Sequence, residues 1–218
     1  MKSKLIVALD VESYQAATAL VQVTRDVVDI FKVGSQLFTR VGPRIIEFLH
    51  EQGKECFLDL KYHDIPNTVA KAVESAAALR VRVLTLHVCG GAEMLEAAAA
   101  IPNHPLLLGV TVLTSVGGDV QAEVLRLANL AMACGLDGVI ASPHEIRLLR
   151  EALGKDFLIV TPGIRRSSTK AGDQKRVMTP TEAVTAGASY IVVGRPIIEA
   201  DDPAQAAARI VEEMARTK

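Results

Sequence analysis

The feature that most constrains the fold is a regular alternation of short apolar runs with longer helix-forming segments. Eight runs rich in Val, Ile and Leu have the length of strands, at residues 5–9, 30–33, 56–61, 83–88, 106–112, 138–141, 157–161 and 190–193. Strands that alternate with helices form parallel βαβ units. Eight such units in 218 residues predict one closed (β/α)8 TIM barrel. The alternative is an open doubly wound sheet, but no Gly-x-Gly-x-x-Gly follows the first run, where a dinucleotide fold needs it.

Helix-start signals agree with this layout. Pro66, Pro180 and Pro203 stand where a first helical turn is expected, because proline is tolerated there. Thr179 and Asp202 precede two of these prolines and are suitable N-caps. No low-complexity linker or charge block divides the chain, so we expect a single catalytic domain over residues 1–218.

Composition excludes several classes of function. The 24 basic and 25 acidic residues nearly cancel, which leaves no field to attract nucleic acid or an anionic membrane. The apolar runs are too short to span a membrane, and the opening MKSKLIVALD lacks the pattern of a signal peptide. Three scattered cysteines without zinc-site spacing indicate a reduced protein with no structural metal. We therefore expect a cytoplasmic protein.

Ionisable residues interrupt two of the apolar runs. Lys32 lies inside the second run, Asp59 and Lys61 close the third, and Asp64 follows shortly after. Residues two apart on a strand share a face, so Asp59 and Lys61 are expected side by side. Buried charges are costly unless paired, so we predict that these four residues form an alternating network that keeps both lysines protonated. Lys61 could then act as a general acid. The alternative is a purely structural ion-pair network.

A second feature suits an anion. The turn Val-Gly-Arg-Pro at 193–196 follows the last strand, where a glycine allows close approach and Arg195 offers a forked donor to phosphate. Phosphates in TIM barrels are often held by the loops after strands seven and eight. The long basic loop 164–177 precedes this turn, and we expect it to be a mobile lid. The alternatives are a plain strand-to-helix turn and a solvated surface loop.

With these residues assembled, the whole chain resembles the orotidine 5′-phosphate decarboxylase family. The resemblance is carried by VALD at 7–10, FKVG at 31–34, DLKYHDIPNT at 59–68, TPGIR at 161–165 and VGRP at 193–196. It implies decarboxylation of orotidine 5′-monophosphate to uridine 5′-monophosphate and CO2, the last step of de novo UMP biosynthesis. It also implies that no cofactor or metal takes part, and that two identical subunits share their active sites.

The resemblance further assigns a role to each matching residue. Lys61 would donate a proton to C6 of the pyrimidine, and Asp59 would face the substrate carboxylate. Asp64 would reach the active site of the partner subunit. The other implied contacts are Lys32 in the charge network, Ile65 and Thr68 across the interface, Asp10 and Lys32 at the ribose, Thr114 and Ser142 at the pyrimidine end, and Arg165, Gln174, Gly194 and Arg195 at the phosphate.

Two other functions remain open at this point. Mg²⁺-dependent sugar-phosphate decarboxylases and aldolases, such as 3-keto-L-gulonate 6-phosphate decarboxylase, share an Asp-x-Lys-x-x-Asp motif but place a metal-binding carboxylate on the second strand. That position holds Lys32 here, and a cation would repel the metal. A non-catalytic barrel that binds a phosphate ligand is the second alternative, although a mere binder gains nothing from the buried charge of Lys61.

Overall fold

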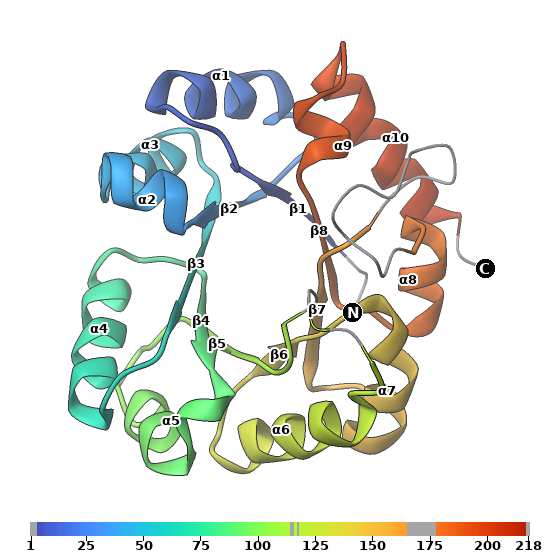
Figure 1. Cartoon of the computed structure of the whole chain (residues 1–218). Helices are drawn as coiled ribbons and strands as arrows, with labels where there is room; N and C mark the ends of the chain where they lie inside the picture. The colour runs from blue at the N-terminus through green and yellow to red at the C-terminus, as the bar shows by residue number, and fades with distance from the viewer. Residues whose placement is uncertain (1–3, 114–115, 117, 165–177, 217–218) are drawn as a thin grey trace.

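The computed structural model describes residues 4–113, 116, 118–164 and 178–216. Within these residues, eight parallel strands form a closed barrel in chain order, with β1 pairing to β8 (Figure 1). The strands are β1 (Lys4–Ala8), β2 (Ile30–Gly34), β3 (Glu55–Tyr62), β4 (Val83–His87), β5 (Leu106–Val110), β6 (Gly138–Ile140), β7 (Leu158–Thr161) and β8 (Tyr190–Val193). The predicted TIM barrel and all eight predicted strands are confirmed. The open doubly wound sheet was the wrong alternative.

Strand β5 shows the largest shortfall from its predicted range. It ends at Val110 and not at residue 112, because Val110 pairs with Ile140, the last residue of the short strand β6. Beyond that pair, the Thr111 hydroxyl group donates a hydrogen bond to the Ile140 carbonyl at 3.1 Å. The chain therefore leaves the ladder where its neighbour ends.

Helices surround the barrel and connect successive strands (Figure 1). They are α1 (Tyr14–Thr24), α2 (Ser35–Val41), α3 (Arg44–Glu51), α4 (Pro66–Ala78), α5 (Ala92–Ala99), α6 (Gln121–Ala133), α7 (Ile146–Leu153), α8 (Pro180–Ala186), α9 (Arg195–Ile198) and α10 (Pro203–Ala215). The predicted caps are confirmed: Thr179 accepts a hydrogen bond from the Glu182 N–H group, and Asp202 accepts one from that of Gln205. Among the described residues, no helix is both long and apolar enough to cross a membrane.

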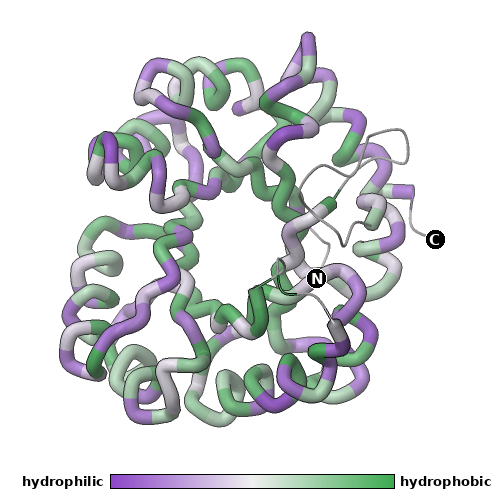
Figure 2. Tube along the Cα trace, in the orientation of Figure 1, coloured by the Kyte–Doolittle hydropathy of each residue, from purple (hydrophilic) through white to green (hydrophobic). Residues whose placement is uncertain are grey.

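The apolar side chains form two layers. The larger cluster lies between the strands and the helices, and Figure 2 shows apolar strands at the centre with polar positions recurring along the helices. A smaller cluster fills the inside of the barrel with side chains that include Ile6, Phe57, Leu108 and Val192. The barrel interior is thus a packed core and not a pore. Only its end remains open to a ligand.

Candidate active site

A cavity of about 260 Å³ opens at the carboxyl ends of the strands. Its floor includes Phe57 and Val192, which belong to the packed interior of the barrel. Its polar side carries five charged side chains, namely Asp10, Lys32, Asp59, Lys61 and Arg195. Its apolar side comes mainly from Val110, Val112, Leu113, Ile140, Pro162 and Ile164. The cavity is therefore lined by both charged and apolar side chains.

The charged side chains on β2 and β3, together with Asp10 just after β1, alternate in sign. The Lys32 ammonium lies 2.9 Å from Asp10 Oδ1 and 3.6 Å from Asp59 Oδ2. The Lys61 ammonium donates to Asp59 Oδ1 at 2.8 Å. The side chains of Lys32 and Asp59 are only 12% and 13% exposed, so water screens their interaction weakly. The structure thus brings together Lys32, Asp59 and Lys61, with Asp10 at the outer end.

The Asp59 carboxyl group is held in its charged form. Burial alone would raise its pKa, but the charges of Lys32 and Lys61, together with hydrogen bonds from Lys61 and Thr85, lower the pKa below the usual value. The Thr85 hydroxyl group donates to Asp59 Oδ1 at 3.0 Å. Asp59 is therefore a fixed negative charge between two cations at neutral pH.

Strand β3 is irregular where it supplies these groups. Leu58 pairs with Leu84 on β4, but the next pair is Tyr62 with Leu86, so the intervening residues form a bulge. Lys61 adopts a left-handed backbone conformation with φ of 52°. The prediction that Asp59 and Lys61 lie side by side is confirmed, because the Lys61 ammonium lies 2.8 Å from Asp59 Oδ1. The bulge and the left-handed backbone of Lys61 were not predicted.

Asp64 does not join the network within one chain. Its carboxylate accepts a hydrogen bond from the Ile65 N–H group at 2.7 Å, and it forms no ion pair with any other described residue of the chain. The prediction that Asp64 extends the alternating charges was wrong for a single subunit. Ile65 is 67% exposed, and Thr68 in α4 is exposed as well, so both lie outside the cavity.

Two glycines leave room for the charged groups. A Cβ atom on Gly34 would lie 3.2 Å from the Lys32 ammonium and 3.6 Å from Asp10 Oδ1. A Cβ atom on Gly194 would lie 3.4 Å from Asp10 Oδ2. Gly194 and Arg195 both line the cavity next to Asp10. The turn after β8 is thus part of the same site as the network.

The remaining predicted residues have different outcomes. Ser142 is 1% exposed, and its N–H group donates to Glu145 at 2.9 Å at the start of the short turn Pro143–Glu145. It is not among the residues that line the cavity, and its contact with the pyrimidine stays a prediction. Thr114, Arg165 and Gln174 lie outside the described residues, as do residues 165–177 of the predicted lid at 164–177.

Sequence reasoning missed Thr85 and the apolar side of the cavity. Thr85 is the one hydroxyl residue in the strand Val83–His87 and is fully buried, a signal that resembles the one given by Lys32. The apolar lining residues Val110 and Ile140 carry no such signal, because their side chains look like ordinary core.

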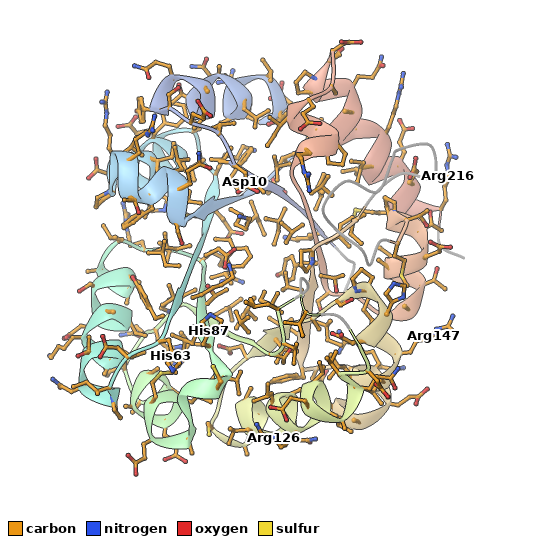
Figure 3. All side chains as sticks on the ribbon, in the orientation of Figure 1. Asp10, His63, His87, Arg126, Arg147 and Arg216 are labelled. Atoms are coloured by element: carbon orange, nitrogen blue, oxygen red, sulfur yellow. The ribbon has the colours of Figure 1, made fainter. Side chains whose placement is uncertain are left out.

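Figure 3 shows His63 and His87 close to each other, with ring centres 5.8 Å apart, while Arg126 and Arg147 point outward.

The fold and the cavity define a TIM-barrel enzyme whose site suits a small anionic ligand with an apolar part. The chain matches the family described as "Orotidine 5'-phosphate decarboxylase / HUMPS family" over residues 3–210. It is 52% identical to the orotidine 5′-phosphate decarboxylase of Syntrophotalea carbinolica, over 98% of this chain and 96% of the relative. It is 49% identical to the orotidine 5′-phosphate decarboxylase of Haemophilus influenzae, over 94% of this chain and 96% of the relative.

Solved structures agree with the sequence comparisons. The crystal structure of orotidine 5′-phosphate decarboxylase from Lactobacillus acidophilus is 39% identical, with a TM-score of 0.85 over 97% of this chain and 99% of the other. The crystal structure of the enzyme from Pyrococcus horikoshii is 28% identical, with a TM-score of 0.82 over 97% of this chain and 99% of the other. The chain belongs to the orotidine 5′-phosphate decarboxylase / HUMPS family.

Proposed function

We propose that this cavity is where the chain converts orotidine 5′-monophosphate to uridine 5′-monophosphate and CO2, with Lys61 as the proton donor. The reaction itself follows from membership of the family and from relatives of about half identity over nearly their full length. The chain is thus a carboxy-lyase of pyrimidine biosynthesis. The observation that carries the site assignment is the Asp59 carboxylate held between the ammonium groups of Lys32 and Lys61.

The chemistry requires a fixed cation beside C6 of the pyrimidine. When the C6–carboxylate bond breaks, its electron pair stays on C6 and CO2 leaves. A preorganised ammonium stabilises this developing charge and then donates its proton to C6. Lys61 lines the cavity and is held by Asp59 at 2.8 Å, which fixes the direction of its ammonium group. Solvent then returns a proton to the lysine.

The rest of the cavity supports binding and orientation. Asp10 and Lys32 offer an acceptor and a donor to the ribose hydroxyl groups, at a distance of 2.9 Å from each other. Gly194 and Arg195 offer a close backbone and a forked cation to the phosphate. The apolar lining by Val110 and Ile140 excludes water from the pyrimidine, which strengthens the electrostatic interactions. Binding energy from the phosphate can thus be used at C6.

The Mg²⁺-dependent alternative is disfavoured by the position of Lys32. Its ammonium lies between Asp10 and Asp59, the two carboxylates that would otherwise be available to a divalent cation. Among the described residues, no group of three His, Cys, Asp or Glu side chains is arranged to hold a metal ion. The distinguishing experiment must therefore test metal dependence together with substrate.

The first experiment follows the ultraviolet absorbance of orotidine 5′-monophosphate mixed with purified protein in excess EDTA. We expect conversion to uridine 5′-monophosphate, and no conversion by Lys61→Ala protein that retains its circular dichroism spectrum. Lys155→Ala, which changes an exposed lysine away from the cavity, is the matched control and should remain active. Activity only on a sugar phosphate with Mg²⁺, or turnover by Lys61→Ala, would contradict the proposal.

We further propose a homodimer in which Asp64 completes the site of the partner subunit. The support is that Asp64 and Ile65 are exposed, lie shortly after the strand that carries Lys61, and that Asp64 forms no ion pair with another described residue of its own chain. Mixing Lys61→Ala and Asp64→Ala proteins should restore activity, because each hybrid dimer contains one intact site. About a quarter of the wild-type activity is expected after random exchange between the two-fold symmetric subunits. Exchange without recovered activity would refute shared sites.

We also place the enzyme in the cytoplasm as one domain over residues 1–218. All three cysteines are free thiols, which suits a reducing compartment. One family model matches residues 3–210, which supports a single domain over this range.

A further inference from the structure

We propose that Thr85 is a positioning residue for this reaction, because its hydroxyl group holds the Asp59 carboxylate and the Lys61 backbone at the same time. The inference rests on the proposed function, since it concerns how that site is kept in shape. Thr85 itself lies on β4, below the cavity, and does not line it.

The contacts of Thr85 use both properties of a hydroxyl group. Thr85 Oγ1 donates to Asp59 Oδ1 at 3.0 Å and accepts the Lys61 N–H group at 2.9 Å. A hydroxyl group has one proton to donate and lone pairs to accept, so it can make both bonds together. The Lys61 ammonium donates to the same Oδ1 atom at 2.8 Å. Thr85, Asp59 and Lys61 therefore form a closed ring of hydrogen bonds.

The bulge in β3 explains why a side chain is needed at this place. Lys61 has a φ of 52°, a conformation that a residue with a side chain adopts at a cost. Thr85 accepts the Lys61 N–H group in place of the backbone carbonyl that a regular ladder would offer. Thr85 is fully buried, so its hydroxyl group needs partners within the protein, and Lys61 and Asp59 supply them. The hydroxyl group thus stabilises the backbone turn that aims the lysine.

The same hydroxyl group acts on the charge of Asp59. Asp59 forms ion pairs with Lys32 from β2 and Lys61 from β3. Asp10 pairs with Lys32 on its other side. His87, at the end of β4 next to His63, interacts electrostatically with Asp59 and Lys61. The hydrogen bond from Thr85 is one of the causes that lower the pKa of Asp59. Loss of the hydroxyl group should therefore raise the pKa of Asp59. As the pH is lowered, the variant should then lose activity at a higher pH than the wild type does.

The test compares substitutions with and without a hydroxyl group. Thr85→Val keeps the shape and removes the hydroxyl, whereas Thr85→Ser keeps it. Thr24→Val is the matched control, because Thr24 is equally buried but donates to the Leu20 carbonyl in α1 at 2.7 Å, outside the barrel. Each protein is measured for kcat and KM on orotidine 5′-monophosphate across pH, with circular dichroism to confirm the fold.

We expect Thr85→Val to lower kcat by roughly 10- to 100-fold, as for a lost buried hydrogen bond to a charged group, with KM changed less than about threefold. The acid limb of its kcat profile should move to higher pH. Thr85→Ser should stay close to the wild type in both respects, and Thr24→Val should change neither. If Thr85→Val does not fold, Thr85→Ala is measured against the same expectations.

Two results would overturn the inference. One is a variant without the hydroxyl group whose kcat and acid limb match those of Thr24→Val. The other is a Thr85→Ser protein as impaired as Thr85→Val, because the defect would then not come from the hydroxyl. Lys61→Ala separates this failure from that of the proposed function. Turnover by Lys61→Ala would refute the site itself, whereas an inactive Lys61→Ala with a fully active Thr85→Val would refute only the role of Thr85.

Discussion

Replacing Lys32 by methionine tests the charge network most directly. Methionine keeps a long apolar side chain but removes the cation that lies 3.6 Å from Asp59 Oδ2 and 2.9 Å from Asp10 Oδ1. The side chains of Lys32 and Asp59 are mostly buried, whereas that of Asp10 is 53% exposed. We therefore expect the loss of free energy of unfolding to come mainly from the contact between Lys32 and Asp59.

The distances set the size of the loss. Two unit charges 3.6 Å apart attract each other by about 4.6 kcal/mol at an effective dielectric constant of about 20. Lys61 still neutralises the other oxygen of Asp59, which reduces the loss, and the half-exposed Asp10 adds at most about 1 kcal/mol. We expect a loss of about 3 kcal/mol, which is typical of breaking a buried pair by removing one partner. For a chain of this length, the melting temperature should fall by about 6–12 °C.

The pH dependence gives the prediction a sign. In the wild type the pKa of Asp59 is lowered, so the pair contributes stability at neutral pH that is lost as the pH falls through that lowered pKa. Without Lys32 the pKa of Asp59 rises, and the carboxylate takes up a proton at a higher pH. The destabilisation should therefore be largest at pH 7 and should become smaller as the pH falls into the range where carboxylates titrate.

Urea unfolding at one fixed protein concentration measures this loss. Lys32→Met is compared in the wild-type and Asp59→Asn backgrounds, and the difference between its two effects is the coupling energy of the pair. We expect a coupling of about 2–3 kcal/mol, in the range measured for contacting residues. A loss below about 1 kcal/mol at pH 7, or an equal loss in both backgrounds, would refute the reasoning from burial and distance.

Three further predictions concern the phosphate site, a glycine and the thiols. Arg195→Ala should raise KM for orotidine 5′-monophosphate by roughly 30- to 100-fold through loss of charge-assisted hydrogen bonds, and an unchanged KM would move the phosphate elsewhere. Gly34→Ala should leave the melting temperature nearly unchanged but lower kcat, because its Cβ atom would press on the Lys32 ammonium from 3.2 Å; an unchanged kcat would contradict this. A thiol reagent should modify only Cys89 rapidly in the native protein, since Cys56 and Cys134 are buried and burial raises the pKa of Cys56 to about 12. Rapid reaction of a second thiol would contradict the buried positions.

The elements that follow from periodicity could be predicted from the sequence. The strands appear as apolar runs, and the caps at Thr179 and Asp202 depend only on neighbouring residues. The meeting of Lys32 with Asp59 was also predictable, because a charge inside a buried strand requires a partner on the adjacent strand.

Features that depend on three-dimensional detail could not be predicted. The bulge at Lys61 arises from how β3 and β4 pair, and no local pattern marks it. Asp64 was placed in the network because it is close in sequence, although its carboxylate accepts the Ile65 N–H group and forms no ion pair with another described residue of the chain. Ser142 follows a strand, as many site residues do, but its turn buries it.

The closure of the barrel affects the order in which a growing chain acquires its parts. Lys32, Asp59, Lys61 and Thr85 lie in the first four strands and Asp10 follows the first, whereas Arg195 follows the last strand. The first four strands therefore leave the ribosome with the reactive charges before the phosphate anchor has been synthesised. Only pairing of β8 with β1 brings Gly194 next to Asp10 and removes the two open sheet edges. A chain truncated before β8 would thus carry the reactive groups without a substrate site and would expose strands prone to aggregation.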